Sequence, residues 1–209
     1  MRLTWFGHSA FRLDCGSIVY FDPYKVEGSH DADIVLISHG HYDHLDPKSI
    51  AAVSKDDTVV ICPNACVGKV ESDAHGLSIG DAVTLGPVRV EAVASYNLEK
   101  TNHQMDSCLG YVVEAEGKRV YHGGDTDNIP EMKELGRIDA ALLPVGGTYT
   151  MDWREAADAV ATIKPKIAVP MHYGEVVGTL EDAVMFRNKV NSDKTAKAVI
   201  LKKGESIEV

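Results

Sequence analysis

The sequence predicts an α/β (α+β) fold, a four-layer αββα sandwich in which two mixed β-sheets pack face to face and helices flank them. Three observations support this prediction. Short strand-like runs fill the first half of the chain, helices alternate with strands from about residue 129 onward, and both halves carry several strands. A chain of 209 residues with 44% hydrophobic and 25% charged residues is expected to form one domain, residues 1–209.

In the first half, apolar runs bounded by turn residues predict most of the strands. The expected strands are 3–6, 10–13, 18–21, 33–38, 58–62, 82–85, 88–94, 109–114 and 119–122. Glycines 7 and 16 separate the first three of them. Asp46 followed by Pro47 resembles a helix N-cap with proline at the first helical position, so a short helix through Val53 is expected. Residues 64–70 predict another short helix.

In the second half, helical periodicity alternates with strand-like runs. Residues 152–163 predict an amphipathic helix, because Trp153, Ala156, Val160 and their neighbours recur at helical spacing. Asp152 with Glu155 three residues later resembles a capping box. Residues 180–189 predict a second helix, and residues 139–143, 166–169 and 198–201 predict strands.

The formal net charge of -10 disfavours nucleic acid and anionic membrane surfaces as partners, because like charges repel at long range. A local positive site could still accept an anionic small molecule. No apolar run reaches the length of a membrane span. Four cysteines without a preceding signal sequence predict reduced thiols and a cytoplasmic location. A homo-oligomer is compatible with the sequence.

The most informative segment is Ser38-His-Gly-His-Tyr-Asp-His-Leu-Asp46, which directly follows the expected strand 33–38. The chain has nine histidines, and His39, His41 and His44 lie within six positions. Imidazole nitrogens and carboxylate oxygens are good ligands for zinc and similar cations, so this segment predicts a metal site. The alternative, a solvated loop that is rich in histidine by chance, is disfavoured by that clustering.

The same segment matches the HxHxDH signature of the metallo-β-lactamase superfamily. The chain resembles its branch of small metal-dependent hydrolases similar to ascorbate-6-phosphate lactonase, and the resemblance covers nearly the whole chain. It rests on five further segments: TWFGHSAF at 4–11, FDP at 21–23, GGDTD at 123–127, LPVGGTYTMD at 143–152 and PMHY at 170–173. The resemblance implies a metallo-β-lactamase-like fold and two divalent metal ions. Zn²⁺ is favoured, and Mn²⁺, Fe²⁺ and Ni²⁺ also accept such ligands.

The resemblance also implies a division of the ligands. His39 and His41 would hold the first ion, Asp43 and His44 the second. Asp125 would bridge both ions, and His172 would complete the second site. The family usually supplies a third histidine to the first ion after the strand that is here 88–94. This chain has Asn97 near that place, a poor zinc ligand, and His103 six residues later. Either residue could be the third ligand, or His103 could be an exposed loop residue.

Further residues are expected around the ligands. Metal-bound histidines usually donate their second ring N–H to a carboxylate or carbonyl, and Asp22 and Asp46 are placed to accept it, although each could be a turn residue. His8 could approach the site or be a buried, hydrogen-bonded histidine. Thr148, Tyr149 and Tyr173 lie in loops that follow strands and are expected to contact the substrate.

The predicted function is a metal-dependent hydrolase. A metal-activated hydroxide, formed because a bound cation lowers the pKa of water to roughly 7, would attack a small, anionic ester, lactone or phosphoester. Asp125 and Asp43 are the predicted catalytic carboxylates. The alternative is a non-catalytic metal-binding sensor or interaction protein on the same fold. The missing third histidine supports that alternative, and the retained Asp125 and His172 oppose it.

Overall fold

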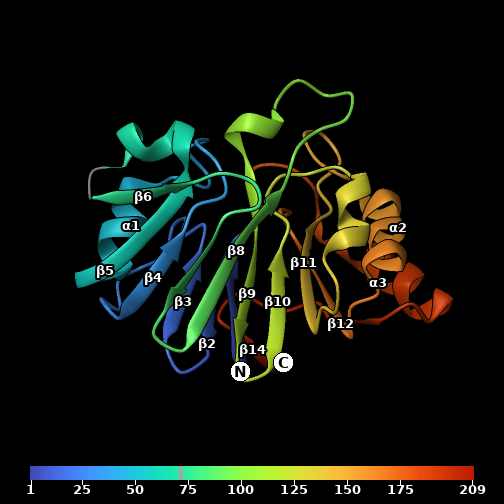
Figure 1. The fold of residues 1–209 in the computed structure, drawn as a ribbon. Coiled ribbons are helices and arrows are strands. Elements are labelled where there is room, and N and C mark those ends of the chain that lie inside the picture. Colours follow the sequence, from blue (N-terminus) through green and yellow to red (C-terminus); the bar gives the residue numbers. More distant parts are fainter. Residues whose placement is uncertain (71–72) are drawn as a thin grey trace.

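The computed structural model describes residues 1–70 and 73–209, which form two seven-stranded β-sheets packed against each other (Figure 1). Helix α1 lies outside the first sheet, and α2 and α3 lie outside the second. The four layers are therefore helix, sheet, sheet and helices. This confirms the αββα sandwich of two mixed sheets.

The first sheet has the strand order β14-β1-β2-β3-β4-β5-β6. Its strands are β1 (Arg2–Gly7), β2 (Ala10–Asp14), β3 (Ile18–Phe21), β4 (Ala32–Leu36), β5 (Ser54–Pro63), β6 (Ala74–Leu77) and β14 (Ser206–Glu208). Pairing is antiparallel from β14 to β3 and parallel from β3 to β6. Helix α1 (Pro47–Val53) follows β4, with Asp46 as its N-cap.

The second sheet has the order β13-β12-β11-β10-β9-β8-β7. Its strands are β7 (Ala82–Leu85), β8 (Val88–Ala94), β9 (Leu109–Ala115), β10 (Lys118–His122), β11 (Ala140–Pro144), β12 (Ile167–Met171) and β13 (Lys197–Ala198). Pairing is antiparallel from β7 to β10 and parallel from β10 to β13. The outer helices are α2 (Trp153–Ile163) and α3 (Leu180–Asp193). Within the described residues, the short 3₁₀ helices are η1 (Asn64–Lys69), η2 (Met105–Ser107) and η3 (Pro130–Glu134).

Several elements differ from the sequence predictions. The expected strand 198–201 is reduced to β13, and the closing strand of the chain is instead β14, which pairs with β1. A three-residue strand is too short to show alternation. Strand β6 was not predicted either, because its sequence, AHGL, contains no run of apolar residues. Helix α2 begins as expected, with Asp152 and Glu155 forming a reciprocal capping box.

The largest apolar core lies between the two sheets, because each sheet turns its apolar side chains inward. Phe11 and Phe21 from the first sheet and Tyr111 from the second are fully buried, and the Tyr111 hydroxyl donates to the Ile37 carbonyl across this core. A smaller cluster beneath α1 includes Ile50 and Val53. The packed sheets form a rigid base for the loops at their edge.

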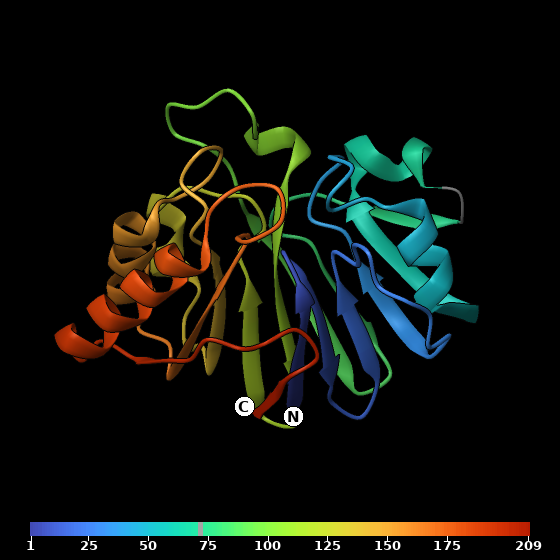
Figure 2. The same cartoon turned by 180° about the vertical axis from the view of Figure 1, so that it is seen from behind.

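The two termini meet at the opposite edge from most of the loops, where β1 pairs with β14 (Figure 2). The Val209 N–H donates to the Met1 carbonyl at 3.0 Å. Among the residues that the structure describes, no helix has both the length and the apolar character needed to cross a membrane.

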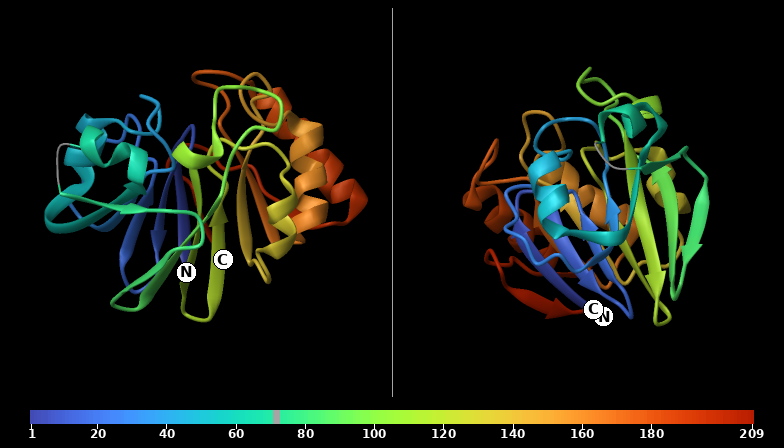
Figure 3. Two further views of the ribbon diagram at one scale, coloured as in Figure 1. Left: turned by 45° about the horizontal axis from the view of Figure 1, so that its top comes forward. Right: turned by 90° about the vertical axis from the view of Figure 1, so that its left-hand side faces the viewer.

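The parallel strands deliver the functional loops to one edge of the molecule. Strands β4, β8, β10 and β12 point toward the same edge, and the segments that follow them gather there (Figures 1 and 3). His39 follows β4, Asp125 follows β10 and His172 follows β12. Residues far apart in sequence are thereby brought together.

One buried carboxylate away from this edge gives a test of stability. Asp139, before β11, accepts hydrogen bonds from the Arg119 backbone N–H at 3.0 Å, from Arg137 at 2.9 Å and from Lys166 at 2.8 Å. Burial opposes its ionisation, but Lys166, Arg119 and Arg137 hold its pKa at about 2, below the ordinary 3.8. We expect Asp139→Asn to lower the free energy of unfolding at pH 7 by about 1–2 kcal/mol, measured in urea.

The pH dependence follows from the sign of that shift. A carboxylate with a depressed pKa stabilises the fold fully above its unfolded value, and the contribution is lost as pH falls from 3.8 toward 2. The difference between wild type and Asp139→Asn should therefore narrow below pH 4. An unchanged difference down to pH 2 would contradict this assignment.

Candidate metal centre

The histidine-rich segment after β4 forms a tight turn over the edge of the first sheet. The backbone N–H groups of His44 and Leu45 both donate to the His41 carbonyl, at 3.1 and 2.8 Å. This turn allows His39 and His44 to be buried while His41 stays exposed. The alternation of His39 and His41 places both imidazoles on one side, with their ring nitrogens 2.9 Å apart.

The first candidate metal group consists of His39, His41 and His103. One ring nitrogen from each lies within 4.8 Å of the others. The ring centroids of His41 and His103 are 5.0 Å apart, and those of His39 and His103 are 4.9 Å apart. Three imidazoles around one point are a suitable ligand set for a zinc-like cation.

His103, rather than Asn97, supplies the third imidazole of this group. His103 is buried, and its Nδ1 is 2.9 Å from the Asn97 Oδ1. The Asn97 amide nitrogen donates to Asp127 Oδ1 at 3.1 Å and to the Tyr149 carbonyl at 3.0 Å. The prediction that Asn97 is a ligand is therefore corrected: its polar atoms are engaged, and its oxygen orients the ring of His103.

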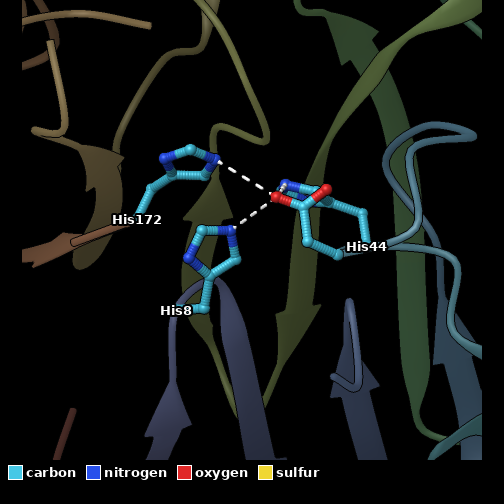
Figure 4. Close-up of side chains that lie close together, drawn as sticks. His8, His44 and His172 are labelled. Carbon is cyan, nitrogen blue, oxygen red and sulfur yellow. Dashed lines mark hydrogen bonds and ion pairs between the residues drawn. The ribbon is translucent and has the colours of Figure 1, made fainter. Parts of the chain in front are cut away.

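The second candidate group consists of His8, Asp43, His44 and His172. Asp43 Oδ2 lies 2.9 Å from the His8 Nε2, 3.8 Å from the His44 Nε2 and 3.9 Å from the His172 Nε2. Figure 4 shows His8 and His172 directed toward a shared carboxylate oxygen, with His44 beside it. His8 thus belongs to the cluster itself, which the sequence left undecided.

Asp125 lies between the two groups. Its Oδ2 is 3.0 Å from the His172 Nε2 and 3.2 Å from the His103 Nε2, and its Oδ1 is 3.3 Å from the His44 Nε2. Its Oδ2 is also 4.0 Å from the His39 Nε2. One carboxylate therefore reaches imidazoles of both groups, as a bridging ligand would.

Three residues of the centre have a left-handed backbone although none is glycine: His8 with φ 48°, Asp22 with φ 40° and His172 with φ 59°. Such conformations are uncommon for residues with a Cβ and cluster at functional sites. The His172 N–H donates to the His8 carbonyl at 3.0 Å, so the turn after β1 and the turn after β12 hold each other in place.

The electrostatics of the cluster favour ionised carboxylates. Burial opposes the ionisation of Asp125, but His172, His44 and His103 beside it hold its pKa well below the ordinary range. The pKa of Asp43 is about 2 despite burial, because His8 hydrogen-bonds to it and His44 lies close. Burial and the neighbouring His44 hold the pKa of His39 well below 6.5. Ionised carboxylates and neutral imidazoles are the forms that bind cations, so His39 is in its binding form, whereas Asp125 and Asp22 raise the pKa of His44 well above 6.5 and a cation there would displace a proton.

The donor set fits divalent cations. Within the described residues, four buried ligand atoms lie close to one another but do not meet the geometry of a hydrogen bond with any partner: the Nε2 atoms of His44, His103 and His172, and the Oδ1 of Asp125. Buried polar atoms without partners are costly, and these converge on the space around Asp125. Cations bound there would satisfy them. The arrangement thus fits two ions, one at each group, with Asp125 between them.

A second layer of residues fixes the ring of His44. Its Nδ1 lies 2.7 Å from the Asp22 Oδ2, and the Ser38 N–H and hydroxyl donate to the two Asp22 oxygens at 2.6 Å each. Asp22 therefore contacts the ring nitrogen of a candidate ligand histidine that faces away from the metal group, as expected. Asp46 does not, because its carboxylate accepts from Lys48 N–H and Ser49 Oγ as the cap of α1.

Asp22→Asn tests this outer layer. An amide at this position no longer stabilises the His44 ring as a carboxylate does, and loss of such partners typically weakens metal affinity by about 10- to 100-fold. We expect competition with a chromophoric chelator to show that loss for the second ion, with secondary structure by circular dichroism unchanged. Wild-type affinity for both ions would contradict the role assigned to Asp22.

A cavity of about 260 Å³, called here the main cavity, opens directly onto the cluster. Five candidate ligands line it, together with four other residues: His41, Asp43, His103, Asp125 and His172, then Tyr42, Asn102, Tyr149 and Val176. Tyr149, one of the predicted substrate contacts, lines this cavity and is 40% exposed.

The other two predicted substrate contacts lie elsewhere. Thr148 is exposed in the same loop as Tyr149 but does not line the main cavity. The prediction for Tyr173 is corrected: its side chain is buried and stacks on Trp5, with ring centroids 5.2 Å apart. The left-handed turn at His172 sends the next side chain into the core instead of the cavity.

Comparison with known proteins shows the family to which this chain belongs. The beta-lactamase superfamily domain matches residues 2–172, which include all the candidate ligands. A UPF0173 metal-dependent hydrolase of Archaeoglobus fulgidus is 31% identical over 229 residues, covering 100% of this chain and 99% of the relative. The chain belongs to the beta-lactamase superfamily, among its UPF0173 metal-dependent hydrolases. It is therefore a metal-dependent hydrolase, and both the resemblance and the enzyme class predicted from the sequence are confirmed.

Solved structures of similar proteins share the architecture. A crystal structure of a protein from Parabacteroides distasonis is 34% identical, with a TM-score of 0.84 over 95% of this chain and 91% of that one. Igni18, described as a metallo hydrolase from the archaeon Ignicoccus hospitalis, is 27% identical, with a TM-score of 0.84 over 99% of this chain and 97% of that one. The two-sheet scaffold and its loop edge are those of the superfamily.

Proposed function

We propose that this hydrolase cleaves a small anionic ester, lactone or phosphoester with the help of two divalent cations, zinc being favoured. The observation that carries the proposal is the position of Asp125, whose carboxylate reaches imidazoles of both candidate groups. His39, His41 and His103 would hold one cation, and Asp43, His44 and His172 the other. His8 would support the second group through Asp43.

Bound at this centre, two cations would supply an activated water, with its pKa lowered to roughly 7, and electrophilic polarisation of the scissile group. The side chains of the protein would orient the reacting groups and accept and donate protons. Asp125 is ionised at neutral pH and would accept a hydrogen bond from a water held between the groups. Asp43 is held by His8 in one orientation. Tyr149 offers a hydroxyl at the cavity for binding the substrate.

The size and setting of the main cavity support a small substrate. Its volume of about 260 Å³ lies just below the roughly 300–1,000 Å³ typical of ligand sites, which suits a compact metabolite rather than a polymer. The net charge of -10 also opposes a nucleic-acid substrate. All four cysteines are free and buried, which supports action in the reducing cytoplasm.

The proposal is tested by metal analysis combined with a substrate screen. The protein is stripped with a chelator and reloaded separately with Zn²⁺, Mn²⁺, Fe²⁺ or Ni²⁺, and bound metal is counted by mass spectrometry. Turnover is then measured on p-nitrophenyl esters, lactones and bis-p-nitrophenyl phosphate. We expect two ions per chain and metal-dependent turnover of at least one substrate class. One tightly bound ion without turnover on the whole panel would favour the metal sensor instead.

A further inference from the structure

A second cavity of about 110 Å³ lies against the other side of the first metal group. It shares His41 and Asn102 with the main cavity and also touches His39. Its remaining wall comes from η1 and from the segment before β9, including Lys69 and Ser107. We call it the Lys69 cavity. The proposed reaction at Asp125 gives it no role.

Lys69 brings a positive charge directly beside the metal ligands. It ends η1, and its ammonium lies against Gly40, the residue between His39 and His41. A Cβ added at Gly40 would be 2.9 Å from the Lys69 Nζ and 3.3 Å from the Cys66 Sγ. The absence of a side chain at position 40 therefore makes room for the ammonium next to the first group.

The charge of Lys69 contrasts with its surroundings. Among the residues that line the main cavity and the Lys69 cavity, it is the one lysine or arginine. Two other lysines are paired: Lys100 with Asp127 at 3.0 Å and Lys25 with Glu175 at 3.1 Å. Across residues 1–70 and 73–209, the structure gives the Lys69 ammonium no carboxylate partner. The net charge of the chain is -10 and repels anions at long range. The positive charge of Lys69 provides a local attraction for an anionic ligand beside the first metal group.

We propose that the Lys69 cavity binds a negatively charged group of the substrate, a carboxylate or phosphate, while the scissile bond lies in the main cavity at Asp125. The inference rests on the proposed hydrolase function and narrows its substrate class. The substrate carries its charge at a group separate from the bond that is broken, since His41 stands between the two cavities. Lysine recognises such groups as a point charge, and the Asn102 amide at the junction can donate a further hydrogen bond.

This arrangement predicts an effect on binding rather than on chemistry. Lys69 contacts no candidate catalytic carboxylate, so its loss should raise KM for a substrate with a remote anion and leave kcat within about twofold. The KM for a neutral substrate should not change when Lys69 is removed. Arginine at the same position keeps the charge and should retain most of the affinity.

The test compares Lys69→Ala and Lys69→Arg with Lys189→Ala in the zinc-loaded protein. Lys189 lies on α3, at the other side of the molecule, and its loss changes the net charge equally (Figure 1). The substrates are p-nitrophenyl acetate and the mono-p-nitrophenyl ester of glutaric acid, which differ in a remote carboxylate. Calorimetry with inorganic phosphate measures anion binding without turnover.

We expect Lys69→Ala to raise KM about tenfold for the glutarate ester alone and to weaken phosphate binding by a similar factor. Lys69→Arg and Lys189→Ala should remain within about twofold of wild type. Equal phosphate affinity in Lys69→Ala and wild type, or equal KM changes for both esters, would overturn the proposal. If wild type cleaves neither ester, that result counts against an ester as the proposed substrate, and the phosphate titration still decides the role of Lys69.

Discussion

Asp125→Asn is expected to reduce turnover by more than about 100-fold and to remove at least one of the two bound cations. Loss of residues that merely orient metal ligands costs about 10- to 100-fold, so loss of the carboxylate shared by both groups should exceed that range. An asparagine keeps the shape but lacks the charge that His44, His103 and His172 surround. Without that negative charge between them, the two cations would repel each other more strongly, and the second cation would bind more weakly.

The measurement combines kcat/KM with metal content by mass spectrometry. Asp139→Asn is the matched control, because it also neutralises a buried aspartate but lies outside the cluster. It should lose stability yet keep both ions. Wild-type turnover in Asp125→Asn, or equal metal loss in the two variants, would refute the bridging role. His41→Ala is expected to behave like Asp125→Asn in turnover.

His103→Ala is expected to remove the ion of the first group and to abolish turnover, while the second group keeps its ion. Without His103, only His39 and His41 remain in that group, and two imidazoles hold zinc far more weakly than three. Asn97→Ala should have a smaller effect, a loss of affinity of about 10- to 100-fold, because Asn97 acts by orienting the His103 ring.

Zinc titration by calorimetry separates the two variants. The expected pattern is one strong site in His103→Ala and two sites, one of them weakened, in Asn97→Ala. His75→Ala serves as control, because His75 is exposed on β6 and should leave both sites unchanged. Two wild-type affinities in His103→Ala would show that the third ligand comes from elsewhere.

The sequence predicted the parts of the centre whose ligands are close together or lie directly after a strand. His39, His41, Asp43 and His44 occur within one turn, and local spacing is enough to group them. Asp125 and His172 follow β10 and β12, whose parallel course brings strand ends to one edge. The sandwich was predictable for the same reason, since most strands carry clear apolar runs.

Other assignments depended on tertiary structure. The segment from Asn97 to His103 has no periodicity, and the chain must fold back on itself for the Asn97 N–H to bond to the His103 carbonyl. The sequence left His8 undecided and wrongly predicted Tyr173 as a substrate contact, because a left-handed residue redirects the side chain that follows a strand. Such a turn brings His8 to Asp43 and takes Tyr173 to Trp5. No pattern in one sequence reveals those conformations.

The central claim is that two cations lie on either side of Asp125. A crystal structure of the zinc-loaded protein, with anomalous diffraction recorded at the zinc edge, tests it most directly. The account predicts two anomalous peaks, one among His39, His41 and His103 and the other among Asp43, His44 and His172, both in contact with Asp125. A single peak away from Asp125, or ligands drawn from other residues, would contradict it.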